Sequence, residues 1–362
     1  MMAGWQWRTD VLLRPGMRAA IVRGILTLLM VVCSAGVHAR DVTDMAGRTV
    51  TLPERITSIY SSSHPVSLLL YALAPEMLVG INYRIREDLR PYLPKAVVEL
   101  PVIGAVMGHG GKMDPEEVLR LGPDVVIVWL DRFSDNERIL AQFDKVGLPV
   151  VFVRLDTLED HPETLRFLGD LLGREERAGM LEIYISNVLG KLHDTVGRIA
   201  PEARRQVYYA EGPDGLATEC DESWHAEAII LAGGSNVHRC KQTRHVGMDR
   251  VSLEQIMLYR PDFVLAQDEK FTQTVLSNPA WQGIPAIDAG AISFAPTLPF
   301  NWIDRPPSFM RAIGAQWLAN RLYPAIYPLD IKEETRRFYR LFLDVELDDA
   351  QISRILAGQS QG

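Results

Sequence analysis

The sequence is short of cysteines, of excess basic residues and of long apolar runs, and each shortage excludes a class of protein. Three cysteines in 362 residues cannot hold together a disulfide-rich scaffold. The 38 Lys and Arg residues against 46 Asp and Glu give a net charge of -8, the wrong sign for a nucleic-acid partner. With 47% hydrophobic and 23% charged residues, the chain has the composition of a globular protein and the length for two lobes.

Catalytic motifs are also scarce. Neither a Gly-x-Ser-x-Gly elbow nor a His-Glu-x-x-His pair occurs in the chain. Residues 108–112 look like a phosphate loop, but Val106 replaces its first glycine and Met113 replaces the Ser or Thr that would hold magnesium. His225 and Glu227 match half of a zinc-deaminase motif whose cysteine half is missing. The sequence therefore predicts that the protein is not an enzyme.

The first 39 residues have the pattern of a secretory signal peptide. Four arginines precede an apolar run at residues 25–33, and small residues follow it up to Ala39. The run is too short to span a bilayer comfortably, and no other stretch approaches about 18 uncharged apolar residues. We expect an exported protein that is cleaved after Ala39, with Met17 as an alternative start to Met1.

Cleavage would leave Cys220 and Cys240 as the cysteines of the mature chain. An even pair in an oxidising compartment favours a disulfide. Two buried free thiols are the alternative. A metal site is a third possibility, but it needs more ligands than a lone pair of cysteines supplies.

A repeated segment indicates the architecture. Residues 113–129 align without gaps with residues 251–267, and each copy reads as a short helix, a Pro-Asp turn and a buried strand. Further strand candidates flank each copy, so we predict an α/β fold with two Rossmann-like lobes and mostly parallel sheets. Apolar residues at helical spacing between the lobes predict a single long α-helix as connector. The predicted parts are a signal peptide (1–39), an N-terminal lobe (40–160), a helical connector (161–201) and a C-terminal lobe (202–362).

These features together resemble the periplasmic binding proteins of ABC importers for ferric siderophores, haem and cobalamin. Residues 116–127, their echo from Glu254 and residues 231–236 are the most specific pieces, and residues 302–308 are similar to a branch that handles metal chelates or oxyanions. The resemblance implies a periplasmic, monomeric protein that delivers its ligand to a permease dimer with its ATPase. It also implies that Glu116 and Glu254 dock onto permease arginines. Solvated acids that complement helix dipoles are the alternative.

The ligand is expected beyond the carboxyl ends of the parallel strands. Loop histidines there would complete the shell of a chelated metal, while arginines and aromatic rings would hold an anionic chelate. The predicted ligand-binding residues are His64, Tyr83, Arg84, His109, Trp129, Trp224, His225, Arg244, His245, Trp302 and Arg305, and the predicted metal ligands among them are His64, His109, His225 and His245.

A ferric siderophore is the first expectation for the ligand, and no cofactor is expected besides the metal of the chelate itself. A nickel or cobalt chelate, cobalamin, and molybdate or tungstate are alternatives. Ala105 stands where haem-binding members carry a tyrosine, which counts against haem. A periplasmic metal-dependent enzyme is a remote alternative, and a structural or chaperone-like protein would not need polar loops that converge on a cleft.

Overall fold

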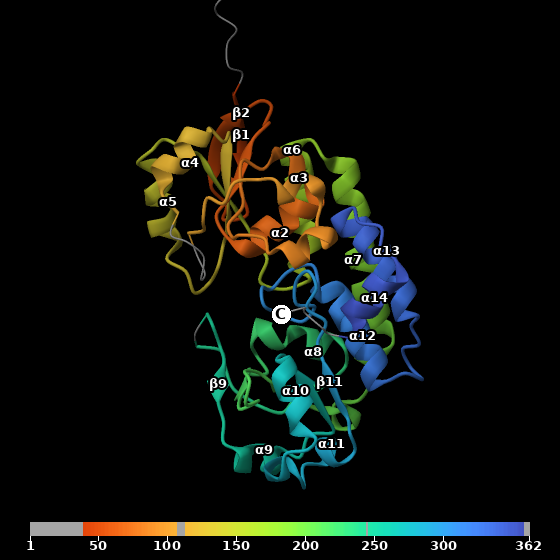
Figure 1. Ribbon diagram of the computed structural model, residues 1–362. Coiled ribbons are helices and arrows are strands. Elements are labelled where there is room, and N and C mark those ends of the chain that lie inside the picture. Colours follow the sequence, from red (N-terminus) through yellow and green to blue (C-terminus); the bar gives the residue numbers. More distant parts are fainter. Residues whose placement is uncertain (1–38, 107–112, 244, 358–362) are drawn as a thin grey trace, which may run out of the picture.

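The computed structural model describes residues 39–106, 113–243 and 245–357, which form two α/β lobes with a layer of helices along one side (Figure 1). The predicted α/β class with mostly parallel sheets is confirmed. Within these residues, no helix combines the length and the apolar character needed to cross a membrane.

The first lobe is built on a three-stranded parallel sheet whose central strand is fully buried. The sheet has the order β3 (Ile59–Ser61), β4 (Val125–Trp129), β5 (Val150–Val153). Alternate residues of β4 enter two apolar clusters on opposite faces. One face is covered by α2 (His64–Leu73) and α6 (Asp160–Leu172), and the other by α4 (Pro115–Leu121) and α5 (Asn136–Asp144). This burial on both faces explains the continuous β-branched run of β4.

The remaining elements of the first lobe are small. Among the described residues they include the antiparallel hairpin of β1 (Ala39–Thr43) with β2 (Thr49–Pro53), and the short helix α3 (Lys95–Val98).

The second lobe repeats the design around four parallel strands. Their order is β11 (Ile292–Phe294), β10 (Phe263–Ala266), β6 (Gln206–Ala210), β8 (Ser235–Asn236). The helices of this lobe are α8 (Glu227–Leu231), α9 (Leu253–Tyr259), α10 (Glu269–Val275) and α11 (Pro285–Asp288). A short antiparallel pair, β7 (Ala217–Thr218) with β9 (Asp249–Arg250), lies apart from the main sheet.

The sequence repeat corresponds to α4 with β4 in the first lobe and α9 with β10 in the second. The side chain of Asp114 caps the start of α4, and that of Ser252 caps the start of α9. Each helix ends at a residue with left-handed backbone, Gly122 at φ 64° and Arg260 at φ 49°. The two copies therefore carry the same local start and stop signals.

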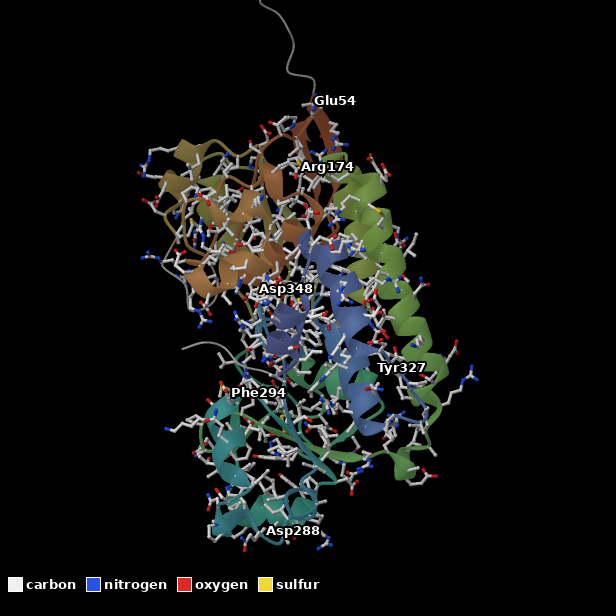
Figure 2. The ribbon with its side chains drawn as sticks, turned by 45° about the vertical axis from the view of Figure 1, so that its right-hand side comes forward. Glu54, Arg174, Asp288, Phe294, Tyr327 and Asp348 are labelled. Carbon is white, nitrogen blue, oxygen red and sulfur yellow. A yellow bond between two sulfur atoms is a disulfide. The ribbon has the colours of Figure 1, made fainter. Side chains whose placement is uncertain are left out.

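The connector is two helices rather than the predicted single one. The first, α6, ends at Gly173, whose φ of 64° is left-handed, and α7 (Glu175–Asp194) then runs along both lobes (Figure 2). Helical periodicity continues across the break, so the apolar pattern did not reveal it. One glycine in a left-handed conformation is enough to end a helix.

Three helices from the last part of the chain complete this layer: α12 (Arg311–Leu322), α13 (Ile331–Leu343) and α14 (Asp349–Leu356). Both α12 and α13 contact α7, and α14 packs against α13. Of these, α13 also packs against α2 of the first lobe. Arg177 on α7 donates hydrogen bonds to the carbonyls of Ala72 (2.8 Å) and Leu341 (2.5 Å). The helical layer thus contacts both lobes and stiffens the connection between them.

A glycine lets α12 lie against the loop that closes the ligand region. A Cβ on Gly314 would sit 1.9 Å from the carbonyl oxygen of Trp302, a backbone atom that cannot rotate away. We expect Gly314→Ala to lower the free energy of unfolding by about 1–3 kcal/mol, measured by urea denaturation. Gly190→Ala on α7 is the matched control, because nothing lies within 4 Å of its Cβ. Equal urea midpoints for wild type and Gly314→Ala would contradict this close approach.

Candidate functional site

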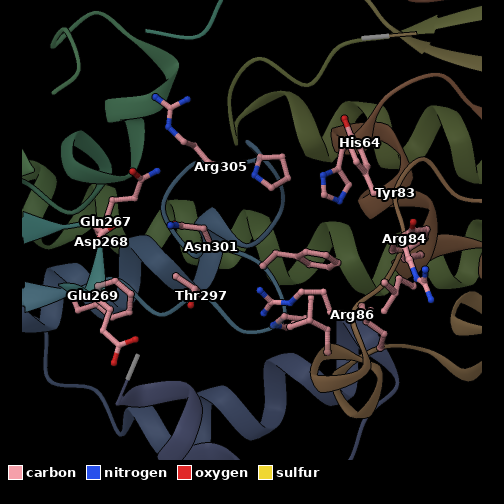
Figure 3. Close-up of a pocket in the computed structure, with 18 of the residues that line it drawn as sticks. His64, Tyr83, Arg84, Arg86, Gln267, Asp268, Glu269, Thr297, Asn301 and Arg305 are labelled. Carbon is pink, nitrogen blue, oxygen red and sulfur yellow. The ribbon is translucent and has the colours of Figure 1, made fainter. Parts of the chain in front are cut away.

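Two adjoining pockets lie between the lobes, with volumes of about 770 and 670 Å³. Both are lined by His64, Tyr83 and Arg305, so they form one space with two compartments. In Figure 3, His64, Tyr83 and Arg84 of the first lobe face Gln267 of the second. As the strand topology requires, the walls come from residues at or just beyond the carboxyl ends of β3, β4 and β10.

His64 is the first residue of α2 and is half-buried at the wall shared by both compartments. Its ring lies 4.6 Å from the ring of Tyr83 and 5.7 Å from that of Phe300. Removal from water lowers the pKa of His64 to about 4, so the imidazole is neutral at pH 7. A neutral imidazole has a free electron pair to offer a metal or a donor group.

His245 reaches across from the second lobe to the first. Its Nδ1 lies 3.0 Å from Oδ2 of Asp131, which is fully buried just after β4. Burial would raise the pKa of Asp131, but hydrogen bonds, the first of them from His245, outweigh it and hold that pKa below the usual range. The His245 ring also packs against Trp129 (5.7 Å) and Trp224 (5.3 Å). This contact holds the two lobes together at the smaller compartment.

His225 was predicted as a metal ligand, and the structure shows both of its ring nitrogens in contact with protein groups. It lines the smaller compartment, but it is buried and its Nδ1 lies 2.7 Å from Oδ2 of Asp304. Its Nε2 lies 2.8 Å from the indole nitrogen of Trp224, which donates to it. Both ring nitrogens are therefore engaged within the protein, and His225 supports the wall of the smaller compartment.

Arg305 was predicted to hold an anionic ligand, but its guanidinium binds carboxylates of its own lobe. It donates from Nε to Glu211 (2.8 Å) and from Nη2 to Glu219 (2.5 Å). Asp304 Oδ2 lies 3.4 Å from Nε, and the carbonyl of Val246 accepts a further bond at 2.9 Å. In Figure 3 the side chain of Arg305 points toward the second lobe. The guanidinium thus neutralises a buried acidic cluster.

This acidic cluster shifts the titration of Glu211. Burial is the main cause, the charge of Asp304 adds to it and Arg305 opposes it, and together they raise the pKa of Glu211 to about 8. Glu211 and Asp304 have no measurable exposure, and Glu219 is 1% exposed. At neutral pH, Glu211 therefore holds its proton in the folded protein.

The remaining predicted residues lie in different places. Arg84 is exposed and lines the larger compartment. Trp224 is almost fully buried, and its ring packs at a tilt against that of Trp129, with the ring centroids 5.2 Å apart. Trp302 is fully buried, and its indole donates to the Tyr339 hydroxyl at 3.3 Å, so the prediction that it contacts ligand was wrong. The predicted residues His109 and Arg244 lie outside the described part of the chain.

Sequence reasoning missed several residues that line the space. Phe300 and Asn301 line the larger compartment, and Val246 and Met248 line the smaller. Phe300 stands two residues before Trp302, at the edge of the segment predicted to contact ligand, and this position could have indicated its role. Nothing in the sequence distinguishes Val246 and Met248 from ordinary apolar residues.

The predicted cysteine pair and the predicted docking glutamates lie away from the pocket. Cys220 and Cys240 form a disulfide in the second lobe. Glu116 is exposed in the first turn of α4, and Glu254 is exposed in the first turn of α9. Each helix also exposes apolar side chains, and the most exposed of them is Leu258, with an exposed fraction of 75%. Figure 1 shows α4 and α9 on the outer parts of different lobes.

Comparison with known proteins gives consistent matches over most of the chain. A family model described as periplasmic binding protein matches residues 63–297. The molybdate-binding protein MolA of Haemophilus influenzae is 24% identical over 342 residues, which cover 88% of this chain and 95% of MolA. A vitamin B12-binding protein of Pectobacterium carotovorum is 24% identical over 59% of this chain and 71% of its own length. The solved structure of an ABC transporter solute binding protein from Sulfurospirillum deleyianum is 37% identical, with a TM-score of 0.82 over 87% of this chain and 98% of that one.

Proposed function

Because the chain belongs to the periplasmic binding protein family, we propose that it captures a metal chelate, such as a ferric siderophore, between its lobes and delivers it to the permease and ATPase of an ABC importer. Members of this family bind substrates for transport and are not enzymes. The two compartments, with volumes of about 770 and 670 Å³, suit a small organic molecule, whereas a bare ion would leave most of this space empty.

The observation that carries the proposal is the pair of histidines on the smaller compartment, one from each lobe. His64 offers an imidazole that burial keeps neutral, and imidazole is a good ligand for iron, nickel and copper. His245 is oriented by Asp131 through Nδ1, which leaves Nε2 as its ligating nitrogen. A carboxylate on the second ring nitrogen is the usual companion of a metal-bound histidine. We therefore favour a chelate whose metal keeps positions open for imidazole.

The rest of the wall suits the organic part of such a chelate. The rings of Tyr83, Trp129 and Phe300 provide flat apolar surface for stacking. The exposed cations Arg84 and Lys270 line the larger compartment from opposite lobes and would attract an anionic chelate. The metal would thus lie near the histidines and the organic body would extend into the larger compartment.

Molybdate or a related oxyanion is a second candidate, favoured by the alignment with MolA over most of both chains. Tetrahedral oxyanions need convergent donors, above all arginine. Among the described residues of the smaller compartment, Arg305 alone is a lysine or arginine, and its guanidinium is committed to Glu211 and Glu219. The larger compartment is lined instead by the exposed cations Arg84, Arg86 and Lys270. The smaller compartment, with its two histidines, therefore favours the chelate.

A fluorescence titration of the mature protein, starting at Arg40, tests the proposal. Trp129 lines the smaller compartment and reports its occupancy. We expect saturable quenching by a ferric catecholate or a nickel–histidine complex, and the double variant His64→Ala/His245→Ala to bind at least about tenfold more weakly. His193→Ala is the control, because this histidine is 82% exposed on α7, away from the pocket.

Two outcomes would overturn the chelate proposal. Tight binding of molybdate that survives the double histidine substitution would establish the second candidate. Absence of binding to ferric catecholate, nickel–histidine and cobalamin alike would exclude a chelate as the cargo.

A further inference from the structure

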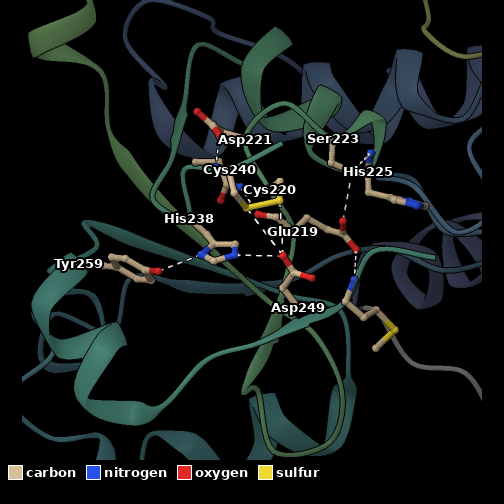
Figure 4. Close-up of a disulfide and its surroundings, with 11 residues drawn as sticks. Glu219, Cys220, Asp221, Ser223, His225, His238, Cys240, Asp249 and Tyr259 are labelled. Carbon is tan, nitrogen blue, oxygen red and sulfur yellow. Dashed lines mark hydrogen bonds and ion pairs between the residues drawn. A yellow bond between two sulfur atoms is a disulfide. The ribbon is translucent and has the colours of Figure 1, made fainter. Parts of the chain in front are cut away.

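A second group of metal-ligating side chains surrounds the disulfide of the second lobe. Cys220, His238, Cys240 and Asp249 each place one ligand atom within 4.8 Å of those of the others. Figure 4 shows His238 and Asp249 beside the Cys220–Cys240 bond. We propose that reduction of this disulfide creates a zinc site formed by two thiolates, one imidazole and one carboxylate.

The distances around Asp249 match those between ligands of a tetrahedral zinc ion. Zinc–sulfur bonds of about 2.3 Å and zinc–nitrogen or zinc–oxygen bonds of about 2.0–2.1 Å place neighbouring ligand atoms roughly 3.3–3.8 Å apart. Oδ2 of Asp249 lies 3.5 Å from Sγ of Cys220 and 3.7 Å from Sγ of Cys240. It lies 3.4 Å from Nε2 of His238. The two sulfur atoms, bonded at about 2 Å in any disulfide, are the pair that must move apart.

His238 is already held in the orientation that a zinc ligand needs. Its Nδ1 lies 2.8 Å from the hydroxyl of Tyr259, and its Nε2 faces Asp249. A tyrosine hydroxyl can donate to Nδ1 or accept from it, so the ring can change tautomer without moving. When zinc binds Nε2, the ring proton resides on Nδ1, and the Tyr259 hydroxyl accepts a hydrogen bond from that N–H. Such support of the second ring nitrogen is typical of metal-bound histidines.

The surroundings suit a metal that binds only after reduction. Cys220 is buried, while His238, Cys240 and Asp249 are half-buried, so an ion can enter. In the disulfide the two sulfur atoms are bonded to each other and neither is a thiolate, which is the form of cysteine that binds zinc. A dithiol supplies two electrons and two protons, which break the sulfur–sulfur bond and give two thiols, while the dithiol becomes a disulfide. Each thiol then releases a proton as its sulfur binds zinc.

The site lies at the base of the loop that forms one wall of the ligand pocket. Cys240 and Asp249 bracket the segment that carries His245 and Met248. Glu219, next to Cys220, accepts a hydrogen bond from the backbone N–H of Met248 at 2.8 Å. Zinc would hold Cys240 to Cys220, as the disulfide does, and would also bind Asp249 at the other end of this segment. This consequence for ligand capture rests on the proposed function, whereas the zinc site itself does not.

Cobalt is the probe that tests the site directly. The untagged mature protein is reduced with dithiothreitol, freed of it under nitrogen and titrated with Co²⁺ alone. We expect one equivalent to bind, with visible bands of tetrahedral cobalt and a thiolate charge-transfer band, and zinc to displace it. The oxidised protein should show neither signal. Tyr259→Phe should weaken cobalt binding by about 10–100-fold while keeping the same spectrum.

Variants separate this site from adventitious binding. Cys220→Ser/Cys240→Ser should abolish the charge-transfer band, and His238→Ala should remove or alter the tetrahedral spectrum, with folding checked by circular dichroism. His64→Ala/His245→Ala should keep the thiolate charge-transfer band, because its substitutions lie in the ligand pocket and leave both cysteines in place. The proposal fails if the reduced protein gives no tetrahedral spectrum, or if the His238 and cysteine variants reproduce the wild-type spectrum. Either result would leave the proposed transport function standing.

Discussion

Arg305→Ala is expected to destabilise the protein by about 3–5 kcal/mol at pH 8, the usual effect of removing one partner from a buried ion pair. The Arg305 side chain is 23% exposed, and its guanidinium contacts three carboxyl groups that are almost completely buried, those of Glu211, Glu219 and Asp304. Without the cation, Glu211 and Glu219 would lose the arginine partner that the structure gives them. The measurement is the free energy of unfolding from urea denaturation at pH 8 and pH 5.

The loss should depend on pH in a definite direction. Burial raises the pKa of Glu211 from 4.5 to about 8, so between these values the folded protein holds a proton that the unfolded chain has released. The unfolded chain then binds fewer protons, and linkage requires stability to fall as pH rises through this window. Arg305 opposes the shift, so its removal makes ionisation of the cluster more costly. The deficit of Arg305→Ala should therefore shrink from pH 8 to pH 5.

Two further variants make this prediction specific. Arg305→Lys keeps the charge but loses the planar fork that reaches Glu211 and Glu219 together, so its loss should be intermediate. Arg239→Ala is the control, because that side chain is 69% exposed and lies 3.9 Å from Asp221, a geometry worth at most about 1 kcal/mol. Wild-type stability in Arg305→Ala, or a deficit that stays constant with pH, would show that the cluster does not depend on this cation.

The fold could be predicted from the sequence because its signals are local. Each copy of the repeat contains its own capping residue, helix stop and buried strand, as Asp114, Gly122 and β4 illustrate. The break between α6 and α7 was missed because it depends on the backbone conformation of a single residue, Gly173. Apolar spacing carries no information on that conformation, and a glycine is also tolerated inside a helix at a modest cost.

The location of the pocket was predictable, but the partners of its side chains were not. Strand topology places His64, Tyr83, Trp129 and His245 on one space. Trp302 lies three residues before Arg305, which lines the pocket, yet Trp302 itself is fully buried. Helix α12 packs closely against its backbone at Gly314. Partnerships between residues distant in sequence depend on how the finished lobes pack, which residue spacing does not encode. The pairing of Arg305 with Glu211 and Glu219 is of this kind.

The same limit applies to the disulfide region. In the sequence His238 stands two residues before Cys240, but Cys220 and Asp249 lie farther off and complete no evident motif with them. Folding brings His238 and Asp249 to the cysteines, since β9 pairs with β7 just before Cys220. The ligand set of the proposed zinc site is therefore a property of the tertiary structure.

Reversing charge at Glu116 and Glu254 together is expected to abolish import while leaving chelate affinity unchanged. Both carboxylates are exposed in the first turns of the repeated helices α4 and α9, one on each lobe. The backbone N–H of Glu254 and the Ser252 side chain hold the pKa of Glu254 below its usual range, so its charge persists at neutral pH. Neither glutamate lines the pocket. Paired charges on separate lobes would let a permease recognise how the lobes are placed relative to each other.

The measurement is ATP hydrolysis by the permease and ATPase reconstituted in vesicles, with chelate affinity followed in parallel by Trp129 fluorescence. Glu116→Lys/Glu254→Lys should reduce the rate of ATP hydrolysis to the rate measured without binding protein. Glu54→Lys/Glu202→Lys makes the same change in charge at exposed positions outside α4 and α9 and should stimulate like the wild type. If both double variants lose activity equally, the effect is one of net charge, which would falsify specific docking. If the first variant loses chelate affinity, these helices act on the pocket and not on the permease.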